Sequence, residues 1–189
     1  MMARFLQEAK ITGQLEHPSI VPVYELGLRT NGQLYYTMKL VRGNTLAHTI
    51  AGCKSLDDRL ALMRSYLDIC HAMAYAHAKG IIHRDLKPSN VMVGEFGECV
   101  VLDWGLAKSC KATSAQEESF AKSVEQLQMD SEIAEGPRTR TRDVLGTPLY
   151  MSPEQARADS SAVGYHSDVY SLGVILFEIL ANRLPHQWS

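Results

Sequence analysis

The stretch His83-Arg84-Asp85-Leu86-Lys87-Pro88-Ser89-Asn90, or HRDLKPSN, follows directly after the apolar pair Ile81-Ile82. It places three charged side chains and an amide in one short segment. A hydrophobic core does not need such a cluster, because charged groups are rarely buried without partners. A plain surface loop would not show this spacing either. The stretch is therefore the first candidate for a chemical site.

The composition fits one ordinary globular domain. The chain has 189 residues, of which 46% are hydrophobic and 21% are charged. Its net charge is -2, and Lys and Arg form no long run, which argues against a nucleic-acid partner or binding to a membrane surface. The apolar run from Val169 to Ala181 contains Glu178 and is too short to span a bilayer, so we expect a buried helix and no membrane segment.

The cysteines indicate a reducing compartment. There are four, without a C-x-x-C pair, which argues against a disulfide scaffold or a zinc site and favours the cytoplasm. They are Cys53, Cys70, Cys99 and Cys110.

Hydrophobic periodicity predicts a helix over residues 3–16, ended by His17-Pro18. Residues 20–28 and 33–41 are rich in β-branched and aromatic side chains and flank a glycine turn, so they predict two antiparallel strands. Two short strands are also expected just after HRDLKPSN, joined by a turn at residues 95–98.

A long amphipathic helix is predicted over residues 55–79, with Ser55 as its N-cap and Gly80 as its stop. Its expected inner face is Leu60, Met63, Leu67, Cys70, Ala74 and His77. Residues 108–143 are polar and rich in Ser and Thr, which predicts a surface loop.

Three segments together resemble the motif series of eukaryotic-like protein kinases, in their bacterial serine/threonine form: HRDLKPSN, LDWG at 102–105 and GTPLYMSPE at 146–154. The resemblance implies an α+β, two-lobe fold. Residues 1–41 would be part of the small lobe, with a regulatory helix, two strands and a hinge. Residues 42–189 would be part of the large lobe, with a long activation segment at 103–154 and a buried helix at about 167–181.

The resemblance implies catalytic roles for five side chains in transfer of the ATP γ-phosphate to protein Ser or Thr hydroxyls. Asp85 would accept the hydroxyl proton, and Lys87 would contact the γ-phosphate. Asn90 and Asp103 would bind Mg²⁺ through hard oxygen donors. Thr147 would hydrogen-bond Asp85 and Lys87.

The same resemblance implies an adenine site. Met38 would precede the hinge, and Met92 would pack beneath the adenine ring. The hinge itself would be Lys39, Leu40 and Val41. Both methionines could equally be ordinary core residues, and the two interpretations are compatible.

Further positions would regulate or support the site. Arg84 would pair with a phosphate on the activation loop, for which Thr139 and Thr141 are the best candidates. Asp168 would hold the backbone of the catalytic loop, and Trp104 stands where the family usually has Phe. We also expect His83 to stack against this apolar group.

Glu8 matches the helix glutamate that pairs with a strand lysine gripping the ATP phosphates, but neither that lysine nor a glycine-rich loop precedes it. We therefore expect a kinase domain cut at both ends, with membrane anchoring through a further C-terminal segment left open. A second hypothesis is a pseudokinase-like scaffold fragment; the intact Asp85, Lys87, Asn90 and Asp103 argue against it. A third, a phosphotransferase of the aminoglycoside-kinase type, shares the His-x-Asp loop but lacks the GTPLYMSPE segment.

Overall fold

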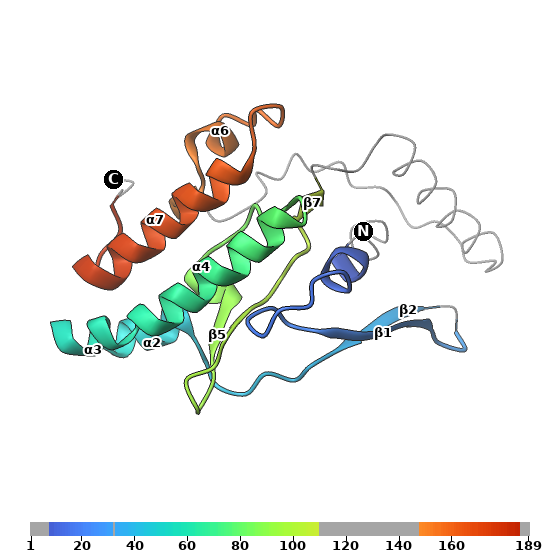
Figure 1. Ribbon diagram of the computed structural model, residues 1–189, viewed down its shortest axis with the longest axis horizontal. Coiled ribbons are helices and arrows are strands. Elements are labelled where there is room, and N and C mark those ends of the chain that lie inside the picture. The colour runs from blue at the N-terminus through green and yellow to red at the C-terminus, as the bar shows by residue number, and fades with distance from the viewer. Residues whose placement is uncertain (1–7, 32, 110–147, 186–189) are drawn as a thin grey trace.

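The computed structural model describes residues 8–31, 33–109 and 148–185. Within these ranges, helices pack side by side and short strands form three small sheets (Figure 1). Apart from one isolated parallel bridge, the pairings are antiparallel. This mixture is the α+β class that the sequence predicts. The predicted helix over 3–16 is described only from residue 8, and residues 8–12 are helical.

The predicted hairpin is confirmed. Strand β1 (Val23–Leu28) pairs with β2 (Leu34–Met38), and a backbone hydrogen bond of 2.8 Å from Arg29 N to Gln33 O closes the turn. Its β-branched and aromatic residues suit a half-exposed ribbon of this kind. The helical residues 8–12 lie beside the hairpin (Figure 1).

A second sheet and a strand pair frame the HRDLKPSN loop. Strand β5 (Val91–Val93) pairs with β6 (Cys99–Val101) through the expected turn, and β3 (Asn44–Thr45) adds to the other edge of β5. Strand β4 (Ile81–Ile82) leads into the loop and pairs with β7 (Lys108–Ser109). The short helix α2 (Leu46–Gly52) follows β3. Because β4 precedes the HRDLKPSN loop and β5 follows it, paired strands hold the loop at both of its ends.

The helix predicted over residues 55–79 is divided into two. Helices α3 (Leu56–Ala61) and α4 (Met63–Ala78) meet at Leu62, whose N–H bonds to Arg59 O only three residues earlier. This tightened turn brings the Leu62 side chain into the core, where it is 7% exposed. The Ser55 cap is confirmed as a capping box with Asp58, and Gly80 follows α4 with a left-handed φ of 83°.

The inner face predicted for this region was only partly right: Met63, Cys70 and His77 are half-buried, and the first two pack against the core, but Ala74 is exposed. Leu60 and Leu67 are exposed, whereas the buried residues of α4 are Ser65, Ile69, Ala72, Met73 and Ala76. Apolar residues occur on more than one side of α4, so their spacing alone does not select a face. Packing against β4, β6 and α7 selects the side of Ile69.

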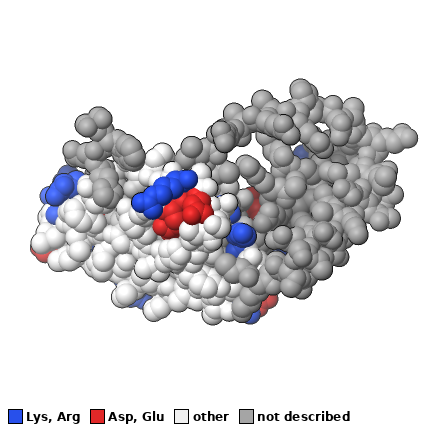
Figure 2. Space-filling model, turned by 90° about the horizontal axis from the view of Figure 1, so that it is seen from above, with Lys and Arg blue, Asp and Glu red and all other residues white. Residues whose placement is uncertain are grey.

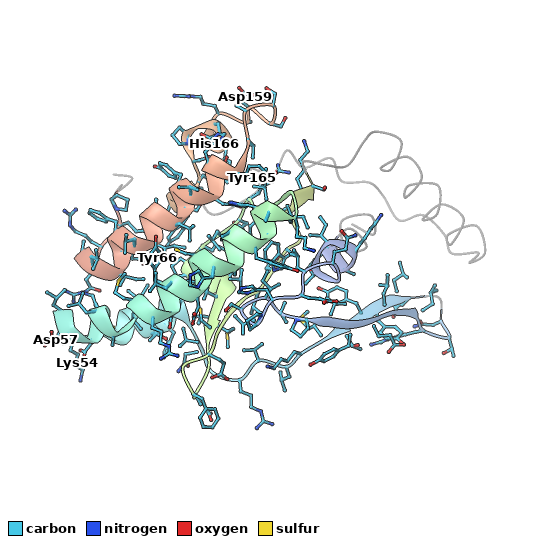
Figure 3. The ribbon with its side chains drawn as sticks, viewed as in Figure 1. Lys54, Asp57, Tyr66, Asp159, Tyr165 and His166 are labelled. Atoms are coloured by element: carbon cyan, nitrogen blue, oxygen red, sulfur yellow. The ribbon has the colours of Figure 1, made fainter. Side chains whose placement is uncertain are left out.

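The predicted buried helix is α7 (Tyr165–Ala181), which begins two residues earlier than expected. Helices α4 and α7 run side by side (Figure 1), and the Tyr66 hydroxyl reaches from α4 towards α7 (Figure 3). It donates a hydrogen bond of 3.3 Å to the carbonyl oxygen of Leu172. Ile69, Ile175 and Ile179 are fully buried between the helices and the sheet. This buried apolar layer supports the HRDLKPSN loop.

The visible surface shows no broad basic area. On the face in Figure 2, the described Lys and Arg side chains are scattered, and one lies against an acidic cluster. Among the helices of the described ranges, none is both long and apolar enough to cross a membrane.

Candidate active site

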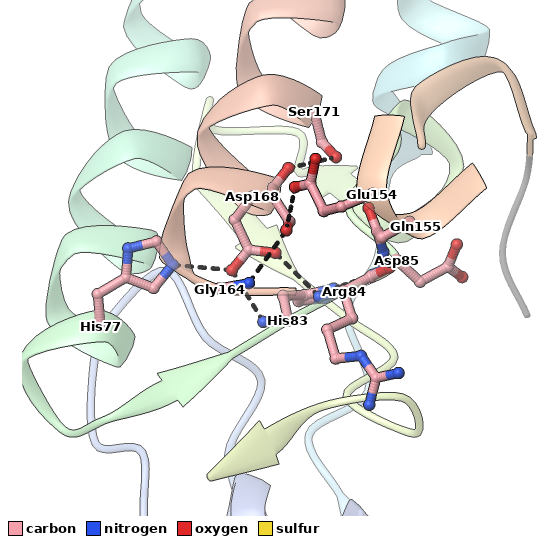
Figure 4. A network of polar contacts seen from close by, with 10 residues as sticks. His77, His83, Arg84, Asp85, Glu154, Gln155, Gly164, Asp168 and Ser171 are labelled. Carbon is pink, nitrogen blue, oxygen red and sulfur yellow. Dashed lines mark hydrogen bonds and ion pairs between the residues drawn. The ribbon is translucent and has the colours of Figure 1, made fainter. Parts of the chain in front are cut away.

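The HRDLKPSN loop is anchored to α7 by one buried carboxylate. Asp168 is 1% exposed and accepts hydrogen bonds of 2.9 Å from the backbone nitrogens of both His83 and Arg84 (Figure 4). His77 of α4 lies on the same carboxylate, with its Nε2 at 2.7 Å from Oδ2. A buried carboxylate needs such donors. The supporting role predicted for Asp168 is therefore confirmed by geometry.

His83 ties the loop to the LDWG segment. Its ring is fully buried and lies 4.7 Å from the indole of Trp104, centroid to centroid, as expected. Its Nδ1 accepts from the Asp85 backbone nitrogen at 3.3 Å, so Nε2 is the protonated nitrogen and donates to Leu102 O at 3.1 Å. Trp104 is 1% exposed, and its indole N–H has no hydrogen-bond acceptor within the described ranges.

The structure brings Asp85, Lys87 and Asn90 together. Lys87 Nζ lies 2.8 Å from Asp85 Oδ2. The Asn90 amide nitrogen donates to Asp85 O at 2.9 Å and to Asp85 Oδ2 at 3.2 Å. The short helix η1 (Pro88–Asn90) turns Asn90 back towards Asp85. One carboxylate oxygen thus receives both a cationic and an amide donor, which orients it without burying it fully.

Asn90 and Asp103 are brought close by the β5–β6 ladder. Leu102 N donates to Asn90 O at 2.8 Å, so Asp103 is one residue beyond the Asn90 pairing. Asp103 has a left-handed φ of 56° and is exposed. Both of these hydrogen bonds of the Asn90 side chain use its amide nitrogen, which leaves Oδ1 for another ligand. A carboxylate and an amide oxygen fit Mg²⁺, which keeps several water ligands.

Glu8 lies at the edge of this site. Its Oε1 accepts from the Tyr36 hydroxyl of β2 at 2.9 Å. A Cβ added to Gly105 would lie 3.2 Å from both Glu8 Oε2 and Asp103 Oδ1, so both carboxylates lie against that glycine. Burial raises the pKa of Glu8; the Tyr36 hydrogen bond opposes this, and the charge of Asp103 adds to it. Burial also raises the pKa of Tyr36.

The residues predicted for the adenine site lie on connected elements. Strand β2 ends at Met38, which is 45% exposed, and the predicted hinge then runs to β3. Lys39, the first residue of this hinge, donates a hydrogen bond from its backbone nitrogen to Pro22 O at 3.1 Å. Leu40 is 79% exposed, and Val41 is half-buried. Met92 is half-buried on β5, opposite Thr45 of β3.

Sequence reasoning missed one contact of the loop and one contact of Asp168, which supports the loop. Gln155 of α6 (Pro153–Ala156) donates from Nε2 to Arg84 O at 2.6 Å (Figure 4). The S-x-x-Q pattern of Ser152 to Gln155 is a capping box and could have predicted the local helix start, but not the contact with Arg84. His77, which is expected on the inner face of its helix, is partly exposed and contacts Asp168.

Glu154, next to Gln155 on α6, helps to hold α6 in place. Its Oε1 accepts from the Ser167 hydroxyl at 2.6 Å and lies 3.2 Å from His166 Nε2. Burial raises the pKa of Glu154, but hydrogen bonds from Ser167 and Ser152 and the nearby His166 outweigh it, so the net pKa is lowered. Helix α6 is thereby docked on the first turn of α7. The predicted Thr139, Thr141 and Thr147 lie outside the described residues.

The site and fold agree with comparisons to known proteins. The family described as "Protein kinase domain" matches residues 1–189. The chain is 42% identical over 194 aligned positions, 96% of its length, to serine/threonine-protein kinase PknD of Protochlamydia amoebophila. It is 37% identical to PknD of Chlamydia caviae and 34% identical to PknD of Chlamydia muridarum, over 97% of its length in each case.

These matches show that the chain belongs to the protein kinase family. The resemblance inferred from HRDLKPSN, LDWG and GTPLYMSPE is confirmed. The chain spans about a fifth of the length of the relatives it matches, covering 19% of the first and 20% of the other two.

Proposed function

We propose that this chain forms the catalytic core of a serine/threonine protein kinase, which transfers the γ-phosphate of ATP to protein Ser or Thr hydroxyls. The main support is the arrangement of Asp85, whose Oδ2 receives Lys87 Nζ at 2.8 Å and Asn90 Nδ2 at 3.2 Å. Phosphoryl transfer depends mostly on positioning and on electrostatic stabilisation, and this arrangement is suited to both. A lysine two residues after the aspartate favours Ser and Thr as acceptors, as the names of the relatives do.

In this proposal Asp85 orients the acceptor hydroxyl and accepts its proton, and Lys87 offsets charge on the transferred phosphoryl group. Asn90 Oδ1 and the Asp103 carboxylate would hold Mg²⁺, which supplies charge neutralisation on the ATP phosphates. Met38, Met92 and the segment Lys39, Leu40 and Val41 would surround the adenine. Thr147 would hydrogen-bond Asp85 and Lys87.

Regulation by phosphorylation is part of the proposal. Arg84 is half-buried within the HRDLKPSN loop, and its Nε has no hydrogen-bond acceptor within the described ranges. A buried guanidinium nitrogen without an acceptor favours binding of an anion, because an unsatisfied buried donor is unfavourable. Phosphate on Thr139 or Thr141 would supply that anion. The separation between Glu8 and Asp103 would change with the position of the helix that carries Glu8.

We assign residues 1–41 to a small lobe and 42–189 to a large lobe with the activation segment at 103–154. The partners would be ATP and a protein substrate rather than nucleic acid, since the net charge is only -2. A cytoplasmic location suits the four separated cysteines.

The test is a γ-phosphate transfer assay on the intact protein, with Ser, Thr and Tyr peptides as acceptors. We expect transfer to Ser and Thr, and a loss of about a hundredfold or more in Asp85→Asn. Asp57→Asn, on the exposed first turn of α3, is the matched control and should retain activity. Equal rates in the wild type and Asp85→Asn would refute the proposal and favour the scaffold hypothesis.

A further inference from the structure

The backbone at Arg84 adopts a conformation that needs support from outside the loop. Its φ is 71°, in the left-handed region that non-glycine residues rarely occupy. Such a conformation is unfavourable by about 1–2 kcal/mol for a residue with a side chain. It persists only where surrounding groups hold it. The residue that follows it is Asp85, so the direction of the Asp85 side chain depends on how this backbone is held.

Two side chains hold the two peptide groups that flank Arg84. Asp168 Oδ1 accepts from Arg84 N at 2.9 Å, which fixes the peptide group before this residue. Gln155 Nε2 donates to Arg84 O at 2.6 Å, which fixes the peptide group after it. The N–H of that second peptide group belongs to Asp85 and donates to His83 Nδ1 at 3.3 Å. Rotation of the Arg84–Asp85 peptide group would therefore break two hydrogen bonds.

The orientation of the Gln155 amide is itself determined. Its Oε1 accepts from Ser152 N at 3.1 Å and from the Ser152 hydroxyl at 3.1 Å. Because a backbone N–H must face an acceptor, Oε1 faces Ser152 and Nε2 faces the Arg84 carbonyl. Ser152 is 1% exposed, which keeps this cap away from solvent. A side chain without a donor could not replace Gln155, and a carboxylate would place an oxygen against a carbonyl oxygen.

We propose that Gln155 is a positioning residue, which holds the Arg84–Asp85 peptide group and thereby the Asp85 carboxylate in the orientation needed for phosphoryl transfer. The inference rests on the proposed kinase function. Helix α6 is docked on α7 through Glu154 and Ser167, so Gln155 links the segment that precedes α7 to the catalytic loop (Figure 4). The Arg84 backbone, and through it Asp85, is held by two elements: by α7 through Asp168 and by α6 through Gln155.

The test compares Gln155→Met and Gln155→Glu in the intact protein by steady-state kinetics and thermal unfolding. Gln155→Met has a similar length and no donor. We expect its kcat to fall about ten- to hundredfold while the KM for ATP stays within about twofold, because small misplacements of a catalytic group reduce kcat. Gln14→Met, at an exposed position, is the control and should leave both constants unchanged.

Gln155→Glu separates positioning from general support of the fold. It keeps an acceptor for Ser152, but its carboxylate repels the Arg84 carbonyl oxygen, whereas the protonated acid can donate to it. We expect its kcat, relative to the wild type, to rise as the pH falls from about 8 to about 5.5. The titratable groups linked to this position through the contacts of the loop, α6 and α7 are Glu154, Asp85, Lys87, Arg84, His83, His77, His166 and Asp168, and all are shared with the wild type.

Wild-type kcat in Gln155→Met, or a flat pH ratio in Gln155→Glu, would overturn the inference while leaving the proposed function intact. Unfolding of both variants at the assay temperature would indicate a purely structural role and would overturn it as well. If the wild type and Asp85→Asn transferred phosphate equally, the proposed function would fail instead, and the inference with it.

Discussion

The Asp168 carboxylate lies 2.9 Å from the backbone nitrogen of Arg84, although the two residues are 84 positions apart. Its other oxygen is 2.9 Å from the backbone nitrogen of His83. Through these two bonds the first turn of α7 holds the start of the HRDLKPSN loop. The loop's shape is therefore a tertiary property, set by a helix that comes much later in the chain.

Asp168→Asn should destabilise the fold strongly. Asparagine has one acceptor oxygen, so one of the two backbone N–H groups would face an amide NH₂, inside the protein. We expect the free energy of unfolding to fall by about 3 kcal/mol, measured by urea denaturation. Asp159→Asn, on an exposed loop (Figure 3), is the control and should give a much smaller loss. Equal losses in the two variants would contradict the anchoring role.

Trp104 should contribute to stability through its volume rather than through its indole N–H. Trp104→Ala would leave a large cavity beside His83, and we expect a loss of about 3–5 kcal/mol. Trp104→Phe also loses volume, but it removes the buried N–H that has no acceptor within the described ranges, so its loss should be no more than about 2 kcal/mol. Denaturant unfolding of both variants tests this order. A Phe variant as unstable as the Ala variant would show that the N–H has a stabilising partner.

The stability contributed by Glu8 should depend on pH. Its pKa in the folded protein is raised above the ordinary value of 4.5, first by burial, so the folded state binds this proton more tightly than the unfolded state. Stability from this group is therefore present below pH 4.5 and is lost as the pH rises through the folded pKa. Glu8→Gln should remove that slope and be more stable than the wild type at neutral pH.

The measurement is the difference in unfolding free energy between the wild type and Glu8→Gln, from about pH 4 to about pH 8. The lower limit is close to the pKa of an ordinary glutamate, where its titration begins. Tyr36→Phe is informative as a second variant, because its hydroxyl opposes the raised pKa of Glu8. Its slope should extend to higher pH than that of the wild type. A pH-independent difference between the wild type and Glu8→Gln would contradict the prediction.

Lys87 should matter for activity much more than for stability. The Lys87 and Asp85 side chains are only 18% and 10% accessible, but Asp85 Oδ2 keeps the Asn90 amide as a hydrogen-bond donor when Lys87 is replaced. Lys87→Met should therefore unfold close to the wild type while losing about a hundredfold or more in kcat. Lys54→Met, at an exposed position near α3 (Figure 3), is the matched control for both measurements. Activity close to wild type in Lys87→Met would argue against its predicted role.

Local patterns predicted much of the fold. The Gly turn between runs of β-branched and aromatic residues predicted the β1–β2 hairpin, Ser55 predicted the start of α3, and Gly80 predicted the end of α4. Patterns failed where two faces of a helix compete. On α4 the spacing favoured the side of Leu67, which is 53% exposed, because periodicity does not specify which partner a helix will meet.

For the candidate site, the reactive groups could be predicted from the order of residues alone: Asp85, Lys87 and Asn90 lie in one loop, Asp103 follows the next strand, and their motifs indicate the kinase family. These residues are close in sequence, so short-range spacing predicts their proximity. The orientation of the Asp85 side chain, by contrast, depends on the folded chain. That orientation depends on Asp168 and Gln155, 83 and 70 residues further along, whose hydrogen bonds hold Arg84 in a left-handed conformation. A strained backbone persists only when packed elements hold it, and such elements come together only in the folded chain.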